Sequence, residues 1–244
     1  MRLNRVHCEQ ALATGTEAWL PETSAHHVAR VLRLRTGAAL VAFDGSGSDF
    51  RCEIVAVEGD RVRIAVGERT PGLRDSPLAI TLVQAVSRGE RMDWTLQKAT
   101  ELGVRCIVPV LSARSVVRLD EGQAERKLRH WRAIVAGACE QSGRSTLPEV
   151  RTPLEFGRFL ATAPREGQRL VLSPAGPASL AGLASAASRV ELLIGPEGGL
   201  EDGELEAAMR AGFRPVRLGP RVLRTETAGL VALAVLQAMW GDLQ

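Results

Sequence analysis

The sequence predicts an α/β protein of two domains: a small β-barrel-like domain at the amino terminus and a larger domain built on a parallel sheet. Two observations lead to this fold class. Short β-like segments separated by turn signals fill the first part of the chain, whereas from residue 78 onward apolar strands alternate with helical patterns. A stretch rich in Gly and Pro, residues 68–77, separates the two patterns. We therefore set the domains at residues 1–70 and 75–244.

Composition places the chain among globular proteins and limits its partners. Apolar residues make up 45% of the 244 residues and charged residues 24%, so a substantial core can form. The net charge is only +3, so total charge does not imply a nucleic-acid partner and any basic surface must be local. The sequence offers no apolar stretch of signal-peptide or membrane-span length. We expect a cytoplasmic protein with no membrane partner.

The cysteines give no sign of a metal site. The four of them are scattered, without a Cys-x-x-Cys pair or a His at zinc-binding spacing: Cys8, Cys52, Cys106 and Cys139. We expect buried, reduced thiols and no structural metal.

In the amino-terminal domain we expect strands at residues 40–43, 50–57 and 61–66, joined by turns that contain Gly and Asp. A helical pattern over residues 21–34 precedes them. Its apolar residues Val28, Val31 and Leu32 share one face, which would cover the open side of the sheet.

The second domain begins with a strand at residues 78–85, followed by a helix at 90–102 that Gly103 ends. A strand at 105–111 and a long helix at 120–141 come next, and the long helix directs Trp131 inward. The remaining expected elements are a helix at 156–161, a strand at 169–174, a helix at 180–187, a strand at 190–194, and a helix that opens at residues 201–204.

Two Gly- and Pro-rich bends, at residues 192–199 and 218–228, organise the end of the chain. Each follows a short apolar strand, and a single helix separates them. Strand, crossover helix and parallel strand form one unit, so we expect both bends at the carboxyl edge of adjacent strands, where open α/β sheets bind ligands. Glycine lets main-chain groups approach a bound molecule closely, and proline stiffens the bend. Each bend taken alone is more typical of an ordinary turn, but two stiff bends with Glu197, Arg221, Arg224 and Glu226 beside them favour a binding site.

The strongest local basic cluster of the chain leads up to the second bend and continues into it: Arg210, Arg214, Arg217, Arg221 and Arg224. After it, Thr225 is expected to cap a helix that is apolar nearly all round, with Leu230, Val231, Leu233, Ala234, Leu236 and Met239. Such a helix must be covered on more than one side.

These two bends, Ile194-Gly195-Pro196-Glu197-Gly198-Gly199 and Leu218-Gly219-Pro220-Arg221-Val222-Leu223-Arg224-Thr225-Glu226-Thr227-Ala228, closely resemble the signatures of the RsmE family of ribosomal RNA methyltransferases. Shorter stretches at residues 26–33, 87–91, 97–104 and 138–144 also resemble this family. The resemblance implies a PUA-like RNA-binding β-barrel and a SPOUT methyltransferase domain with a deep trefoil knot. It also implies a homodimer that pairs through the carboxyl-terminal region; for the apolar helix, the alternative is a deep position within one chain.

By the same resemblance, the expected function is S-adenosylmethionine (SAM)-dependent methylation of N3 of one uridine, position 1498, in 16S rRNA of the small ribosomal subunit. We assign SAM binding to the bends and to the strand end at residue 172. These residues are Leu172, Ser173, Ile194, Gly195, Pro196, Glu197, Gly198, Leu218, Gly219, Arg221, Leu223 and Thr227.

For catalysis we expect Arg224 to stabilise the charge on a deprotonated uracil. Glu226 or Glu197 would orient Arg224 or accept the N3 proton, and the sequence leaves that choice open. N3 lies on the Watson–Crick edge, so the uridine must be unpaired or turned out.

Contacts to RNA phosphates are expected from basic residues of both domains: Arg2, Arg5, His26, Arg30, Arg33, Arg88, Lys98 and Arg144. Read without the resemblance, the helix positions are equally typical of a solvated charged face, and Arg144 is typical of a polar residue beside a helix C-cap at Gly143.

Three other functions fit part of the pattern. A non-catalytic rRNA-binding or ribosome-assembly protein would use the same basic residues and leave the bends empty. A fold relative acting on another RNA, such as tRNA ribose, differs only in substrate. A phosphate-binding enzyme would use Gly198 and Gly199 at a helix start, but Glu201, Asp202 and Glu204 would repel phosphate there.

Overall fold

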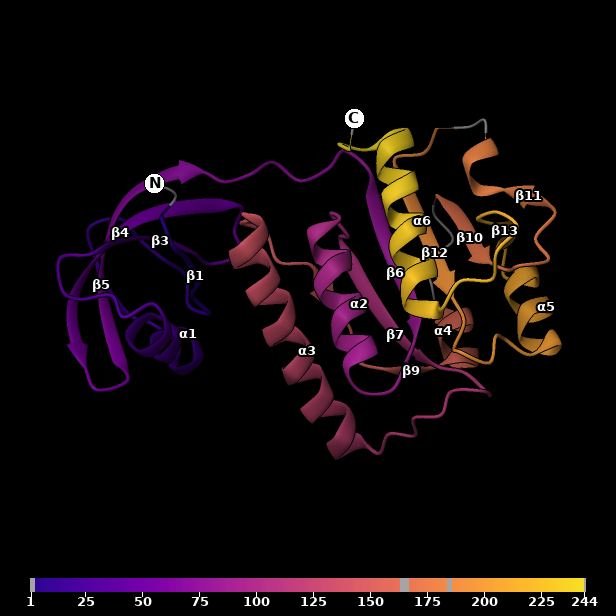
Figure 1. Cartoon of the computed structure of the whole chain (residues 1–244), viewed down its shortest axis with the longest axis horizontal. Helices are drawn as coiled ribbons and strands as arrows, with labels where there is room; N and C mark the ends of the chain where they lie inside the picture. Colours follow the sequence, from indigo (N-terminus) through magenta and orange to yellow (C-terminus); the bar gives the residue numbers. More distant parts are fainter. Residues whose placement is uncertain (1–2, 163–166, 184–185, 244) are drawn as a thin grey trace. The chain divides into compact units, whose positions relative to one another are not determined.

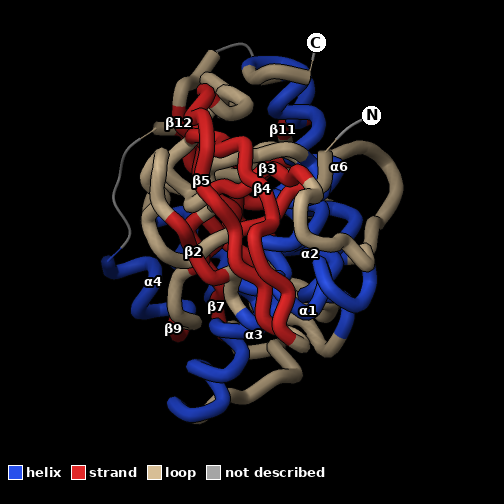
Figure 2. The backbone as a smooth tube through the Cα atoms, turned by 90° about the vertical axis from the view of Figure 1, so that its left-hand side faces the viewer, coloured by secondary structure: helices blue, strands red, loops and turns tan. Residues whose placement is uncertain are grey.

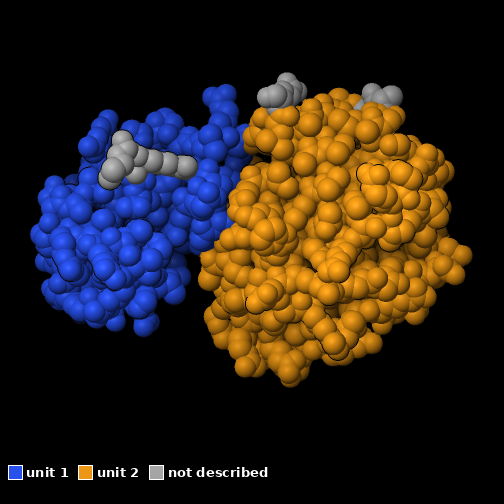
Figure 3. All heavy atoms as spheres, viewed as in Figure 1, with its two compact units in different colours: residues 1–75, 136–147 blue, residues 76–135, 148–244 orange. Residues whose placement is uncertain are grey.

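A computed structural model describes residues 3–162, 167–183 and 186–243. The chain divides into two compact units, coloured separately in Figure 3. The first contains residues 1–75 and 136–147, and the second contains residues 76–135 and 148–244. Arg2, expected to contact RNA, lies outside the described residues.

The first unit is built on a largely antiparallel sheet in the order β1-β3-β4-β5-β2, whose long strands β4 and β5 run side by side in Figure 2. Its strands are β1 (Arg5–His7), β2 (Glu17–Trp19), β3 (Ala39–Phe43), β4 (Ser48–Glu58) and β5 (Arg61–Pro71). Alternate residues of the strands face one core, as in β4, where Phe50, Cys52 and Ile54 are buried. The expected strands are therefore present, and β4 and β5 extend beyond the predicted ends.

The helix expected at residues 21–34 is shorter and changes type. An α-helix, α1 (Glu22–His26), continues as a single π-helical turn, η1 (His27–Val31). The i→i+5 bonding widens that turn, so residues three apart no longer share a face. Val28 is buried as expected, but Val31 is 61% exposed, and its predicted core position is wrong.

Residues 136–147 pack with the amino-terminal residues, so their predicted place in the second domain is wrong. Polar contacts explain this packing. The backbone N–H of His7 donates to Glu140 Oε1 at 2.8 Å. Arg5 forms an ion pair with Asp49, which also accepts from the hydroxyl of Ser145. The buried guanidinium of Arg144 donates to Asp75 at 3.0 Å.

The second unit is built on a sheet in the order β11-β13-β10-β12-β6-β7-β8, with β9 also paired to β7, and every one of these pairs is parallel. The longer strands match the expected ones to within a few residues. The strands are β6 (Ala79–Ala85), β7 (Cys106–Leu111), β8 (Glu149–Val150), β9 (Leu154–Glu155), β10 (Gln168–Leu172), β11 (Ala178–Ser179), β12 (Arg189–Ile194) and β13 (Arg214–Arg217).

Helices cover both faces of this sheet, which is why its central strands are apolar on both sides. On one face of the sheet, Val83 of β6 and Leu193 of β12 share a core with Phe156 of α4 (Phe156–Thr162) and Ala208 of α5 (Asp202–Arg210). The opposite face packs on α6 (Thr225–Trp240), which lies beside α2 (Glu90–Glu101) in Figure 1. The long helix α3 (Glu121–Ser142) contributes residues 121–135 to this unit.

Two expectations for this unit are corrected. The strands that carry the two bends, β12 and β13, are not adjacent, because β10 lies between them and pairs with both. Residues 180–187 do not form the expected helix in their described part: Leu180–Gly182 is a single 3-10 turn, η2. The helix at 90–102 and its stop are confirmed, since Gly103 has a φ of 79°.

All four cysteines are buried and free, as expected. Burial raises the pKa of Cys8 and of Cys106 to about 12 each, so their thiols stay protonated. Within the described residues, no group of three or more His, Cys, Asp or Glu side chains is placed to hold a metal ion. No described helix is both long and apolar enough to cross a membrane.

Candidate active site

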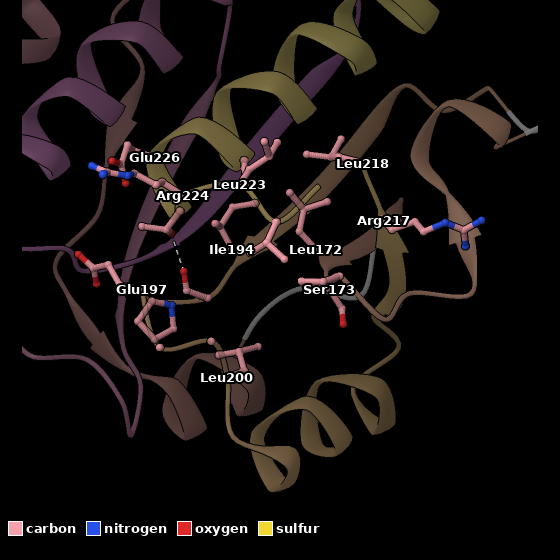
Figure 4. A pocket seen from close by; sticks show the side chains of 18 of the residues that line it. Leu172, Ser173, Ile194, Glu197, Leu200, Arg217, Leu218, Leu223, Arg224 and Glu226 are labelled. Carbon is pink, nitrogen blue, oxygen red and sulfur yellow. Dashed lines mark hydrogen bonds between the residues drawn. The ribbon is translucent and has the colours of Figure 1, made fainter. Parts of the chain in front are cut away.

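A cavity of about 720 Å³ lies at the carboxyl ends of β10, β12 and β13. The position of β10 brings Leu172 and Ser173 between the two bends, and Figure 4 shows Leu172, Ile194 and Leu223 grouped together. These side chains give the cavity an apolar wall. Glu197, Arg224 and Glu226 lie toward one end of it (Figure 4). A cavity of this size, with an apolar wall and a few polar groups, is typical of a small-molecule site.

The first bend closes tightly on itself at Gly195. A Cβ on this residue would lie 3.1 Å from the backbone nitrogen of Leu200 and 3.2 Å from its Cγ. The bend therefore requires glycine here or a shift of its neighbours. Two arginines bind this bend: Arg91 of α2, which also lines the cavity, forms an ion pair with Glu197 at 3.1 Å, and Arg114 donates to the carbonyl of Gly198 at 3.0 Å.

The second bend begins where β13 ends. Gly219 has a φ of 140°, which residues with a side chain rarely adopt. Arg217 points away from the apolar wall in Figure 4 and donates to the carbonyls of Gly176 and Pro177. Further along, Val222 is 80% exposed although it lines the cavity. An apolar side chain in that position offers contact area to a bound molecule.

The two candidate catalytic residues of the second bend lie on either side of the start of α6. Arg224 is the N-cap residue of the helix, and its exposed side chain lies near that of Glu226 in Figure 4. The Oε2 atom of Glu226 is buried and has no hydrogen-bond partner within the described chain. Glu197, in contrast, already has Arg91 as its partner. Arg91 thus bonds Oε1 of Glu197, whereas Oε2 of Glu226 has no side-chain or main-chain partner among the described residues.

Thr225 does not cap α6 as expected. No side-chain bond caps that helix, and the Thr225 hydroxyl instead donates to the carbonyl of Gly195 at 2.6 Å. Gln84 of β6 donates to the same hydroxyl at 3.2 Å. Gln84 is not among the predicted site residues, although a glutamine near the end of a largely apolar strand is a signal of a buried polar role.

The remaining predicted cofactor residues line the cavity, with one exception. Thr227 is exposed and is not among the lining residues, because it lies one position further along α6 than Glu226 and faces away. Leu200, Leu205 and Val216 line the cavity and were not predicted. Leu205 lies on α5, whose helical pattern gave no indication of a ligand.

The residues expected to contact RNA differ in their surroundings. His26, Arg30, Arg33 and Arg88 are exposed, and Arg30 pairs with Asp60. Lys98 pairs with Glu101 at 2.8 Å and lies 5.0 Å from the centre of the Trp94 ring. The guanidinium groups of Arg5 and Arg144 are engaged in the ion pairs of the first unit, with side chains only 9% and 7% exposed.

Comparison with known proteins identifies the class. A family described as an RNA methyltransferase domain matches residues 74–237, and one described as an RNA methyltransferase PUA domain matches residues 20–67. The chain is therefore an RNA methyltransferase with a PUA-like amino-terminal domain.

Individual relatives narrow this class. The curated ribosomal RNA small subunit methyltransferase E of Mycobacterium tuberculosis is 36% identical, over 93% of this chain and 89% of the relative. A crystal structure of the same enzyme from Neisseria gonorrhoeae, bound to SAM, covers 100% of both chains with 37% identity and a TM-score of 0.90. A Legionella pneumophila protein, solved with bound SAM, is 40% identical over 100% of both chains, with a TM-score of 0.95. This chain belongs to the ribosomal RNA small subunit methyltransferase E family, as the resemblance predicted.

Proposed function

We propose that this enzyme uses SAM to methylate N3 of uridine 1498 in 16S rRNA, within the small ribosomal subunit. The observation that carries the proposal is the cavity at the strand ends, where two rigid bends meet an apolar wall and the Arg224–Glu226 pair. The names of the relatives support the small-subunit substrate, and the two SAM-bound neighbours support the cofactor.

The residues of the cavity fit SAM. The apolar wall of Leu172, Ile194 and Leu223 suits the faces of a purine ring. Gly195 lines the cavity and carries no Cβ, so its main-chain groups can approach a bound molecule closely. Glu226, whose buried Oε2 has no hydrogen-bond partner among the described residues, lines the same cavity.

SAM supplies a methyl group on a sulfonium, which is already reactive toward a nucleophile. The task left to this chain is to align N3 and to manage its proton. Arg224 would neutralise the negative charge that spreads to the uracil carbonyl oxygens as N3 loses its proton. Glu226 is the better candidate for the proton acceptor, because the Glu197 carboxylate is already held by Arg91.

RNA would be held by the PUA-like unit and by the residues beside α2. His26, Arg33 and Arg88 are exposed and can approach phosphates, which position an RNA without reading its bases. Arg30 is exposed as well, and it would exchange its ion pair with Asp60 for a phosphate. Arg5, Lys98 and Arg144 already have carboxylate partners, so their contribution to RNA binding would be smaller.

The finer architecture follows the family resemblance. The sheet of the first unit would close into a β-barrel, and the chain after β13 would thread through an earlier loop to form a trefoil knot. The helix α6 supports a homodimer, since Val231 remains 38% exposed on a helix that is apolar nearly all round. An enzyme acting on bacterial small subunits would work in the cytoplasm.

The deciding experiment is methylation of small subunits purified from a strain that lacks this modification. The purified protein and SAM are added, and the rRNA is digested and mapped by mass spectrometry. We expect one added methyl group, on N3 of uridine 1498. A methyl group at any other nucleotide would replace the proposed substrate, and RNA binding with no methyl transfer would favour an assembly protein.

A further inference from the structure

The buried hydroxyl of Thr225 lies between the two halves of the candidate active site. Thr225 is only 7% exposed and stands between Arg224 and Glu226 in the chain. Its hydroxyl makes no capping bond to α6. It reaches across to the first bend and donates to the Gly195 carbonyl at 2.6 Å.

The direction of each bond in this contact is fixed by chemistry. The Gly195 carbonyl can only accept, so the single hydroxyl proton of Thr225 is committed to it. The hydroxyl oxygen must then accept from the Gln84 amide at 3.2 Å. The same amide nitrogen donates to the carbonyl of Ala85 at 3.1 Å, which rules out the reversed amide.

The orientation of the Gln84 amide leaves a buried acceptor without a hydrogen bond. Its side chain is fully buried, and its Oε1 has no hydrogen-bond partner within the described residues. A Cβ on Gly229 of α6 would lie 3.4 Å from that oxygen, so the helix packs closely against the amide. The surroundings therefore fix the amide, and the amide fixes the threonine hydroxyl.

We propose that Thr225 and Gln84 are positioning residues for methyl transfer. The chain of bonds from Gln84 through Thr225 to Gly195 fixes the first bend relative to the start of α6, and therefore Arg224 and Glu226 relative to the cofactor. This inference rests on the proposed function. Displacement of reacting groups by about 1 Å is enough to slow a reaction on the order of 100-fold.

The test compares Thr225→Val, which keeps the shape and removes the hydroxyl, with Thr225→Ser, which keeps the hydroxyl. Single-turnover methylation of unmodified small subunits is measured at saturating SAM, and SAM affinity is measured by calorimetry. For Thr225→Val we expect the rate constant to fall roughly 10- to 100-fold, and SAM affinity to change by less than about threefold. Thr225→Ser should stay within about threefold of the unchanged protein in both.

A second variant guards against a folding defect. Gln84→Met replaces the buried amide with an apolar side chain of similar length and should also slow the rate constant while the protein remains folded. The double variant should be little slower than either single one, because the residues act in one chain of bonds. A Thr225→Val protein with an unchanged rate, or a Thr225→Ser protein as slow as Thr225→Val, would overturn the proposal.

Hydrogen exchange separates this proposal from the proposed function. If the unchanged protein does not methylate small subunits, the proposed function fails, but the contact can still be judged. Backbone amides of residues 197–200 should exchange faster in Thr225→Val and not in Thr225→Ser, because only the former frees the bend. Equal exchange in all three proteins would show that Thr225 does not position the bend.

Discussion

At the scale of single residues, Arg224 is the strongest candidate for direct participation in catalysis. It lies at the cavity, and among the described side chains no ion pair neutralises it. We expect Arg224→Ala to lower the single-turnover rate constant on the order of 100-fold, the loss typical of one removed charge-stabilising donor. Arg210→Ala, on the exposed side of α5, is the matched control and should leave the rate unchanged. Full single-turnover activity in Arg224→Ala would exclude this arginine from the mechanism.

Gly195 tests the cofactor site separately from the chemistry. An alanine Cβ would crowd the backbone nitrogen of Leu200 at 3.1 Å, so the bend must shift. We expect Gly195→Ala to weaken SAM binding about tenfold, equivalent to about 1.4 kcal/mol, as measured by calorimetry. Gly203→Ala is the control, because nothing lies within 4 Å of its added Cβ. Equal affinity in the two variants would contradict a tight bend.

The bend residues were predictable from the sequence, whereas the hydrogen-bond partner of Thr225 was not. Local patterns located Gly195, Gly219 and Arg224, because a bend after an apolar strand is a local property. The same local pattern predicts Thr225 as a helix cap, whereas the acceptor that its hydroxyl bonds lies 30 residues away in the chain. A hydroxyl at a helix start can bond either to the backbone of its own helix or to a carbonyl that the fold brings near, and only the tertiary structure decides between the two.

At the scale of elements, the order of strands was the main feature that the sequence did not determine. The strand β10 lies between β12 and β13, although a direct crossover connects those two in the chain. All three strands are short, and nothing in their sequences specifies which neighbour each one pairs with. Because β10 lies between the two bends, it contributes Leu172 and Ser173 to the wall of the cavity.

The carboxyl end of α3, which belongs to the first unit, contains Glu140, whose effect on stability depends on pH. Burial raises the pKa of Glu140, and this effect exceeds the opposing hydrogen bond from His7. A carboxyl group with a raised pKa in the folded state contributes stability below its unfolded pKa. That stability is lost as pH rises through the folded pKa. Ionised Glu140 therefore destabilises the protein at neutral pH.

We expect Glu140→Gln to be more stable than the unchanged protein at pH 7, and the difference to shrink toward pH 4. The amide oxygen can still accept from the backbone of His7. Urea unfolding at the two pH values measures the difference. Glu125→Gln, exposed on the same helix, should show no such pH dependence. If Glu140→Gln stabilises the protein less at pH 7 than at pH 4, the pKa of Glu140 is not raised by folding.

At the scale of the whole molecule, the two units are expected to respond differently to salt. Contacts to RNA phosphates release counterions, so affinity falls as salt rises, with a logarithmic slope of about −0.7 for each phosphate neutralised on a single strand. The SAM cavity has an apolar wall and main-chain bends, so cofactor binding should change little over the same range. One protein should therefore show salt-sensitive RNA binding and salt-insensitive SAM binding.

The exposed residues around η1 provide the variant for this test. We expect the triple change His26→Ala, Arg30→Ala and Arg33→Ala to weaken RNA binding and to reduce the salt slope by about 1 to 2. SAM affinity should stay the same, because these residues belong to the first unit and the cavity to the second. Glu22→Ala, exposed on the neighbouring helix, controls for changes on this surface and should not reduce the slope. If the triple variant keeps the full slope, the phosphates are held by other residues, and Arg88 beside α2 becomes the next to replace.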